Sequence, residues 1–506
     1  MDAAAPAPTL GAPPFIAAPS ATGVAAQVVL AGPGARSIAF VLDFLIRGCL
    51  ALGWLLLSAW LILGNLDFSI PEDHETLWYL GGVIPAMAIY FLYHVVLEPL
   101  MDGRTPGKRM TGLRVVTRDG VVPSSGALVT RNVFRIVDSL PALYVVGLLF
   151  VMFGRRHARA GDLAAGTVVA VERAPFLEHL AASAGAEEQV AASRDLRQRA
   201  QTLGTRAGGD VAEALAVVDG YRTLAHELGA ARNRPGALVP AAAEHLEAAY
   251  AELHGNVQRP PRRFWLATWS LFRDQVPAAI YAIRWHLLAV TLLFVISTVA
   301  GFTLIYTYPD LIAMFASPQL VATVERGELW TDSLLNVTPS AVLSVSILTN
   351  NIVVSVFAFC SGIVFTLGTF YIVGLNGFSL GAIFALAAQH GLAGRLFDFV
   401  VAHGCVELSC ICISGAAGSY LGEALIRPRA HSRSEAFRLA TRDGIRILAV
   451  VTALLLVCGF IEGYVSPDPE VPRWARVTIG VGYWLFMISL LRGHVFGRSR
   501  GGEVPA

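Results

Sequence analysis

The stretch 400-VVAHGCVELSCICISGAAG-418 decides the fold class, because its apolar length is close to the roughly 20 residues that a helix needs to cross a bilayer. It also carries an imidazole, His403, and a carboxylate, Glu407. Residues four apart lie on one face of a helix, so these two side chains are expected to be neighbours. Because an ionisable group is costly at membrane depth, such residues usually face the interior of a helix bundle. The stretch therefore predicts a transmembrane helix with a polar face turned inward.

Three uses of this polar pair are open. A hydrogen-bonded pair that holds helices together is the structural interpretation. A role in transport or in ligand binding is the functional one. Zinc binding is disfavoured, because no second histidine completes an H-E-x-x-H pattern and no third ligand lies nearby in the sequence. We therefore predict no metal ligand, no cofactor site and no catalytic residue from this stretch.

Composition sets the class of the whole chain. Of its 506 residues, 55% are hydrophobic and 15% are charged, against roughly 25% charged in a soluble domain. The mean hydropathy of +0.58 is that of an integral membrane protein. The net charge of +1 provides no basic field for binding nucleic acid. The six cysteines lie in apolar segments, which favours packing roles over disulfides or metal ligands.

The apolar segments predict an all-α, polytopic helical membrane protein. Segment 136–153 is interrupted by Asp138 and Pro141, and segment 378–389 is too short to cross upright, so either one is a candidate for a re-entrant or tilted element. About nine segments can be placed in all, and they run over 38–63, 77–97, 136–153, 287–306, 343–373, 378–389, 399–425, 447–465 and 477–491.

Charges in the loops predict the orientation in the membrane. Residues 65–76 contain no Lys or Arg, and residues 309–340 contain only Arg326. By contrast, residues 104–135 and 427–446 are rich in arginine. The first two loops are therefore expected outside and the other two inside. Both termini are then cytoplasmic, provided that segment 136–153 does not cross the membrane.

A soluble segment separates two membrane regions. Within it, residues 210–228 and 241–253 have the periodicity of amphipathic helices. We therefore expect two transmembrane bundles joined by a cytoplasmic helical insert. The N-terminus is rich in Ala and Pro without the basic region of a signal peptide, which favours a disordered tail. The predicted divisions are a tail at 1–30, a membrane domain at 31–172, the insert at 173–264, a second membrane domain at 265–492 and a cytoplasmic tail at 493–506.

Four short motifs occur in order in the first membrane region. They are 36-RSIAFVLD-43, 107-GKRMTGLRVV-116, 131-RNVFRIVD-138 and 160-AGDLAAGTVV-169. In this order and spacing, residues 30–172 resemble the RDD membrane-protein family, which is named for one arginine and two aspartates. The resemblance implies that Arg36 and Asp43 are two of these residues. Asp162 is the expected third, with Asp138 as the competing candidate.

The second membrane region carries a different set of motifs. They are 221-YRTLAHELGAAR-232, the pair Asn350-Asn351, 374-GLNGFSLG-381, 403-HGCVELS-409 and 460-FIEGYVSP-467. Over residues 190–492 the chain resembles the family of stage II sporulation protein M. In spore formers the namesake belongs to a membrane complex that remodels peptidoglycan during engulfment. The resemblance implies a membrane protein of the cell envelope, and it does not imply a role in sporulation.

The polar residues of this second region are expected to meet at one depth. On the predicted topology, Asn350 and Asn351 begin one span. His403, Glu407 and Glu462 lie near the outer ends of two others. Each polar group needs a partner in hydrocarbon, so we predict a single intramembrane polar cluster in the outer half of the bundle.

Two other features of this region have structural interpretations. Glu423 follows Glu407 by a helical distance of about 24 Å at 1.5 Å per residue, so it is expected at the cytoplasmic interface and not in the cluster. The pair Asn376-Gly377 is typical of a tight turn, which we expect at the inner face of the membrane.

Three classes of function remain. A scaffold or assembly factor for envelope processes in the bacterial cytoplasmic (inner) membrane is favoured by the resemblance and by an insert suited to docking membrane or cytoplasmic protein partners. The alternative is an ion-coupled transporter or permease that uses buried acids such as Asp43, Glu407 and Glu462. An enzyme is disfavoured, because no nucleophile–base pair or metal triad is recognisable. The sequence predicts no cofactor and no nucleic-acid partner, and the expected surroundings are the lipid bilayer and such proteins.

Overall fold

The computed structural model describes residues 15–20, 22–64, 66, 70–71, 74–138, 158–172, 187–205, 211–233, 240–257, 269–329, 340–468 and 470–495. Among them, helices make up almost all of the regular structure, and seven helices are long and apolar enough to cross a membrane. The all-α, polytopic class is therefore confirmed. The seven candidate spans are Pro33–Leu63, Tyr79–Leu100, Arg284–Thr307, Leu367–Gln389, Gly404–Ile426, Arg433–Tyr464 and Arg473–Leu491.

The chain forms two compact units. One consists of Met1–Gly53 with Ala86–Arg262, and the other of Trp54–Pro85 with Arg263–Ala506. The helices of the expected soluble insert thus belong to the same unit as most of the first membrane region.

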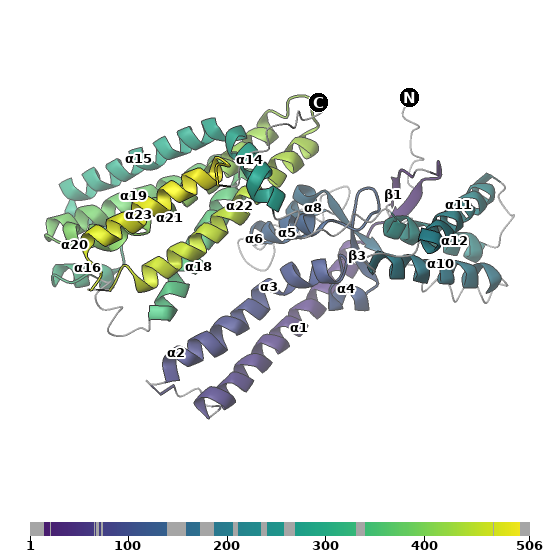
Figure 1. Cartoon of the computed structure of the whole chain (residues 1–506), viewed down its shortest axis with the longest axis horizontal. Coiled ribbons are helices and arrows are strands. Elements are labelled where there is room, and N and C mark those ends of the chain that lie inside the picture. The colour runs from purple at the N-terminus through teal and green to yellow at the C-terminus, as the bar shows by residue number, and fades with distance from the viewer. Residues whose placement is uncertain are drawn as a thin grey trace. The chain divides into compact units, whose positions relative to one another are not determined.

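The membrane part of the first unit is a helical hairpin (Figure 1). Helices α1 (Pro33–Ser58) and α3 (Ile84–Leu100) run antiparallel, and the Tyr93 hydroxyl of α3 donates to Asp43 of α1 at 3.0 Å. Short elements surround this hairpin in the sequence. Three of them belong to the second unit, namely η1 (Ala59–Leu63), α2 (Glu75–Trp78) and η3 (Tyr79–Val83). The others belong to the first unit and are α4 (Pro106–Met110), α5 (Ser125–Val133), α6 (Arg135–Asp138) and α8 (Ala160–Ala165).

Two antiparallel strand pairs form small sheets in the first unit. The first pair contradicts the predicted disordered tail, since residues 15–18 and 26–29 are strands. Val28 and Leu30 are buried, so apolar side chains inside an Ala- and Pro-rich segment hold this hairpin in place. Residues 1–14 lie outside the described residues. The pairs are β1 (Phe15–Ala18) with β2 (Ala26–Val29), and β3 (Leu113–Thr117) with β4 (Thr167–Val171).

Three further helices belong to this unit, and two of them lie where the amphipathic pattern predicts helices. Leu228, Tyr250 and Leu253 are fully or almost fully buried between them. The same hydrophobic core includes Val28 of β2 and Val168 of β4. The three helices are therefore packed onto the two sheets and share one core with them. They are α10 (Glu187–Thr205), α11 (Val211–Asn233) and α12 (Pro240–Val257).

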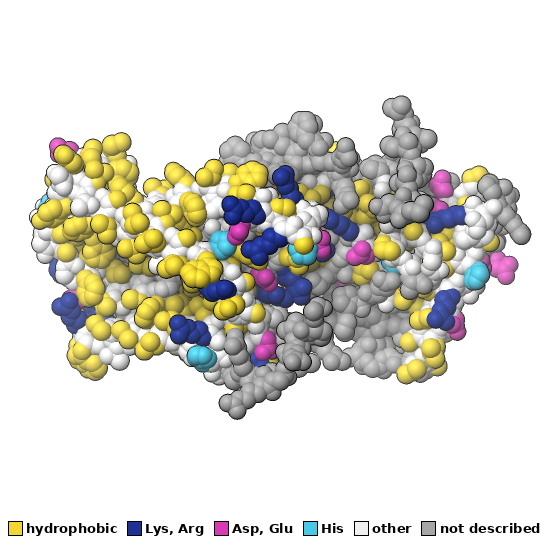
Figure 2. Space-filling view, turned by 90° about the horizontal axis from the view of Figure 1, so that it is seen from above, with side chains coloured by type: hydrophobic (Ala, Val, Ile, Leu, Met, Phe, Trp, Pro, Cys, Tyr) yellow, Lys and Arg dark blue, Asp and Glu magenta, His cyan; other side chains and the backbone are white. Residues whose placement is uncertain are grey.

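The second unit is a bundle around α21 (Gly404–Ile426), whose apolar window is largely buried. Helix α21 packs against α15, α18, α19, α22 and α23. Figure 2 shows hydrophobic side chains over most of the visible face of this bundle, as expected for helices that face lipid. Its other elements are η4 (Leu271–Gln275), α14 (Val276–Ala282), α15 (Arg284–Thr307), η5 (Pro309–Met314), α16 (Pro318–Glu325), α18 (Ser340–Cys360), η6 (Ser361–Ile363), α19 (Leu367–Gln389), α20 (Ala393–Val400), α22 (Arg433–Tyr464) and α23 (Arg473–Leu491).

Glycines let neighbouring helices of this bundle approach closely. A Cβ atom added at Gly381 of α19 would lie 1.9 Å from the Thr298 carbonyl oxygen of α15, and one added at Gly301 would lie 2.1 Å from the Phe378 carbonyl oxygen. Small residues at such contacts bring two backbones into van der Waals range, which is how helices associate where no hydrophobic effect drives them together.

The predicted span 343–373 and the predicted turn at Asn376-Gly377 are both wrong. Helix α18 ends at Cys360, and the chain turns at Phe365 and Thr366, whose φ angles are 47° and 73°. Helix α19 then continues unbroken through the expected turn, where the Asn376 amide donates to the carbonyl of Ile372 at 2.8 Å. Apolar residues lie in and around the observed turn, so hydropathy did not reveal it. Helix α19 is long enough to span the membrane.

The predicted segment 136–153, interrupted by Asp138 and Pro141, lies mostly outside the described residues, which stop at Asp138 and resume at Ala158.

Candidate functional site

Two helix ends bring three ionisable side chains of the second unit together. His403 immediately precedes α21, Glu407 lies in the first turn of α21, and Glu462 lies near the end of α22. His403 Nε2 is 3.8 Å from Glu407 Oε2 and 3.6 Å from Glu462 Oε1. His403 is 3% exposed and Glu462 is 6% exposed. The cluster is thus inside the bundle, where the sequence led us to expect polar groups to meet.

Hydrogen bonds orient two members of this cluster. His403 Nδ1 lies 2.9 Å from the Ser466 hydroxyl, which directs the Nε2 atom of the same ring toward the carboxylates. A side-chain hydrogen bond joins Asn351 of α18 to Glu407. The exposed Asn350 donates to Asn351 Oδ1 at 3.4 Å. Asn351 therefore contacts the cluster directly, whereas Asn350 contacts it only through Asn351.

Within the part of the chain that the structure describes, no permanent cation balances the charge of this cluster. Among the described residues, the ion pairs of Glu407 and Glu462 go only to His403, and no Lys or Arg pairs with either carboxylate. Two adjacent carboxylates in a buried site are unfavourable unless a proton or a cation neutralises part of their charge. The arrangement can therefore hold a proton or a positive ion.

Glu423 lies apart from this cluster, near the opposite end of α21. Its carboxylate is 2.8 Å from His286 Nε2 and 4.0 Å from Arg429. This position agrees with the helical distance of about 24 Å from Glu407 expected from the sequence.

A second set of buried charges lies in the first unit, and it contains the RDD-motif residues. Arg36 Nη2 lies 2.6 Å from Asp162 Oδ2, and Arg131 Nε lies 2.6 Å from Asp162 Oδ1. Arg131 Nη1 reaches Glu98 Oε1 at 2.5 Å, and Lys108 Nζ bonds the same oxygen. The result is a continuous chain of alternating charges from α1 to α4.

The environment of this network shifts the pKa values of Asp162 and Lys108 in ways that bear on their charge. Burial alone raises the pKa of the Asp162 carboxyl, but the charges of Arg131 and Arg36 outweigh it and hold that pKa well below its usual range. Burial lowers the pKa of Lys108 to about 8, and the charge of Glu98 opposes this shift. Asp162 is therefore a fixed anion at neutral pH.

The other two predicted aspartates bind backbone and hydroxyl groups. Asp43 accepts hydrogen bonds from the Thr105 hydroxyl at 2.6 Å and from the Gly107 backbone N–H at 2.9 Å. Asp138 accepts from the Ala160 N–H at 3.3 Å. Of the two candidates for the third motif residue, Asp162 is the one that forms an ion pair with Arg36.

Sequence reasoning missed most of this network. Glu98 and Arg131 were not singled out, although both are fully or almost fully buried. One signal was available, because Lys108 is the only lysine in the chain. Arginine and lysine are not interchangeable in buried ion pairs, so a lone lysine in an arginine-rich chain is a position to examine.

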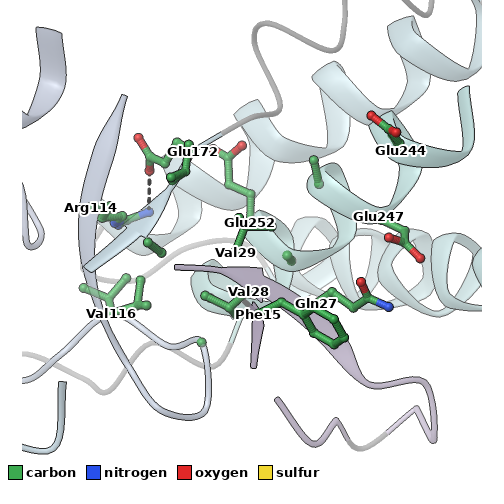
Figure 3. Close-up of a pocket in the computed structure, with 17 residues that line it drawn as sticks. Phe15, Gln27, Val28, Val29, Arg114, Val116, Glu172, Glu244, Glu247 and Glu252 are labelled. Carbon is green, nitrogen blue, oxygen red and sulfur yellow. Dashed lines mark ion pairs between the residues drawn. The ribbon is translucent and has the colours of Figure 1, made fainter. Parts of the chain in front are cut away.

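A pocket lies outside the membrane spans, in the first unit. It has a volume of about 330 Å³, and both sheets and α12 contribute its walls (Figure 3). Val28, Val116 and Ala251 give it apolar walls, and Glu244 and Glu247 of α12 add carboxylates. Part of the charge is internally paired. Arg114 is 3.6 Å from Glu172, Arg197 is 2.9 Å from Glu252, and Arg232 is 3.2 Å from Glu247.

Seven candidate spans and buried polar clusters define a multi-pass integral membrane protein of the helical class. Residues 30–166 match the RDD family, and residues 290–467 match stage II sporulation protein M. Both resemblances predicted from the motifs are confirmed, and their presence in one chain is consistent with a fusion of the two domains. Comparison with curated proteins and with solved structures gave no match.

Proposed function

We propose that this chain is a scaffold or assembly factor of the bacterial cell envelope, without enzymatic activity. In this proposal it is seated in the cytoplasmic membrane with both termini and α10–α12 on the cytoplasmic side. The observation that supports it best is the hydrophobic core that α10–α12 share with the two sheets. A soluble module packed in this way offers a docking surface with a fixed geometry, which lowers the entropic cost of binding a partner. The match to stage II sporulation protein M agrees with an envelope setting.

The pocket is the proposed docking place on this surface. Its apolar walls suit one hydrophobic side chain, and the carboxylate of Glu244 suits a neighbouring basic one. We therefore propose that the occupant is a short segment of a partner protein that places a Lys or Arg beside an apolar anchor.

Site-specific photo-crosslinking tests this proposal. A photoreactive amino acid at Gln27, which lines the pocket, should give one discrete crosslinked product in living cells. The variant Ala251→Trp fills the pocket and should abolish that product together with complementation of a deletion strain. The matched control is Ala214→Trp, at an exposed position on α11, which should preserve both. Full complementation by Ala251→Trp would refute docking at this pocket.

A second candidate function, ion-coupled transport, is favoured by the cluster of His403, Glu407 and Glu462. Carboxylates without a permanent counter-cation inside a helix bundle are typical of ion pathways. Reconstituted liposomes distinguish the two candidates. A transporter should move protons or cations down an imposed gradient and lose this activity on Glu462→Gln, whereas a scaffold should show no flux above empty liposomes.

A further inference from the structure

We propose that His403, Glu407 and Glu462 form a binding site for one divalent transition-metal cation, with Zn²⁺ as the reference ion. This inference concerns a ligand of the second unit and does not depend on the proposed scaffold role. It also revises the interpretation of the sequence, in which the histidine and the first glutamate lacked a third ligand. The fold supplies that ligand from α22, 55 positions after Glu407 in the chain.

The distances between the three groups fit a metal site. Each residue offers one ligand atom, and these three atoms all lie within 4.8 Å of one another. Zinc binds nitrogen and carboxylate oxygen at about 2.0–2.2 Å, so two ligands of a tetrahedral ion are about 3.4 Å apart. The observed separations from His403 Nε2 are 3.6 and 3.8 Å. Small side-chain movements would therefore close the site around an ion.

A buried carboxylate oxygen is a second, independent observation that favours cation binding. Glu462 is 6% exposed, and its Oε2 atom has no hydrogen-bond partner among the described residues. A carboxylate oxygen shielded in this way from water is costly unless a cation or a proton engages it. A metal ion between the carboxylates would coordinate this residue. It would also offset the charge that no Lys or Arg balances in the described ranges of the chain.

The surroundings of His403 also resemble those of a metal-binding histidine. Metal-ligating imidazoles usually use their second ring nitrogen in a hydrogen bond that fixes the orientation of the ring. Ser466 holds Nδ1 of His403 at 2.9 Å, so Nε2 is the nitrogen presented to the carboxylates. Asn351 similarly holds Glu407. These contacts reduce the conformational freedom that metal binding would otherwise have to remove.

The donor set selects the class of ion. One imidazole and two carboxylates suit Zn²⁺ and related first-row ions, whereas Ca²⁺ and Mg²⁺ prefer oxygen ligands alone. Three protein ligands leave a fourth position open to water in a tetrahedral site. Because the ligands come from the start of α21 and the end of α22, the ion would clamp these two helix ends together.

Metal binding to the purified full-length chain tests the site. The protein is prepared in detergent without a histidine tag, stripped with a chelator and dialysed against Zn²⁺, and bound metal is measured by mass spectrometry. We expect one equivalent per chain. The variants His403→Ala and Glu462→Gln should each weaken binding by at least 100-fold. The matched control is Glu423→Gln, near the opposite end of the same helix, which should bind as the wild type does.

The unfolding temperature and X-ray absorption at the zinc edge test the same site independently of the binding measurement. Zn²⁺ should raise the unfolding temperature of the wild type and leave that of Glu462→Gln unchanged. X-ray absorption at the zinc edge should show nitrogen and oxygen ligands at about 2.0–2.2 Å and no sulfur. If a ligand variant fails to fold, the absorption spectrum of the wild type alone decides. The proposal is overturned if the stripped wild type binds well below one equivalent, if both ligand variants retain it, or if sulfur ligands appear.

Discussion

Asp162 accepts a charged hydrogen bond from Arg36 at 2.6 Å, although 126 positions separate the two residues in the sequence. Arg131 binds the other carboxylate oxygen of Asp162 and then reaches Glu98. Glu98 in turn binds Lys108. This chain of charges joins the membrane hairpin to the short helices α4, α5 and α8. The arginine and aspartate that resemble the RDD motif therefore help to hold the first unit together.

Removing the Asp162 charge should destabilise the protein strongly. Asp162→Asn leaves Arg36 and Arg131 buried without their shared carboxylate, and breaking a buried pair in this way costs about 3–5 kcal/mol. Equilibrium unfolding of the purified protein in detergent measures the loss. The control is Asp219→Asn, in an exposed pair with Arg222, which should change stability by no more than about 0.5 kcal/mol. Equal effects of the two substitutions would contradict the role of the network.

The same aspartate should give a defined pH dependence. The folded pKa of Asp162 lies below the unfolded value of about 3.9, so its contribution is complete above that pH and is lost as the pH falls toward the folded pKa. The difference in unfolding free energy between wild type and Asp162→Asn should thus stay constant from pH 7 to about pH 5 and shrink below about pH 4. Unfolding titrations across this range check it. A difference that grows on acidification has the wrong sign for this mechanism.

Hydropathy predicted the membrane class and most of the spans, because long apolar helices facing lipid have a strong local signal. Hydropathy failed to locate a turn where the residues are apolar but the backbone is not helical. Phe365 and Thr366 turn the chain inside an apolar run, whereas Gly377, expected in a turn, serves close helix packing. The strands at 15–18 and 26–29 were missed because their few apolar residues lie in a segment with the composition of a tail.

The candidate sites were predictable only in part, because the sequence indicates depth in the membrane but not the distances between side chains. The predicted topology places His403, Glu407 and Glu462 at a similar depth in the membrane. Only the fold specifies the distances between them that would allow them to bind one ion. The partners of Asp162 were harder to find. Glu98 and Arg131 are far apart in the sequence, and alternating charges between separate short helices have no periodicity that a sequence can reveal.

Helix packing in the second unit should depend on Gly381. An added methyl group would lie 1.9 Å from the Thr298 carbonyl oxygen, so α15 and α19 must separate in Gly381→Ala, at a cost of about 1–3 kcal/mol. Gly482 of α23 is the control, since a Cβ atom there would meet nothing within 4 Å. Gly482→Ala should leave stability unchanged or raise it by up to about 1 kcal/mol, because alanine favours helix. Unfolding in detergent measures both, and an equal tolerance of the two changes would show that the helices are not in close contact.

The predicted orientation is testable by thiol labelling. In a cysteine-free background, Ala216→Cys on the exposed face of α11 should react with a membrane-impermeant maleimide only after the cells are permeabilised. Gln319→Cys on α16, in the loop predicted outside, should react in intact cells. The loop charges give this expectation, since arginine-rich loops remain in the cytoplasm. Labelling of Ala216→Cys in intact cells would place the soluble helices outside and invert the topology.

The variant Glu407→Gln separates a structural cluster from one that holds a proton or a cation. The amide keeps the shape of the side chain and most of its hydrogen bonding, including a contact with Asn351, so the protein should fold and insert at wild-type levels. The carboxylate charge is nevertheless lost, and with it the attraction for a positive ion. We therefore expect Glu407→Gln to fail to complement a deletion strain, although its amount in the membrane and its elution from size exclusion match the wild type. Glu423→Gln is again the matched control and should complement. If Glu407→Gln complements fully, the cluster serves only to hold α18, α21 and α22 together, and the polar motif is explained by packing alone.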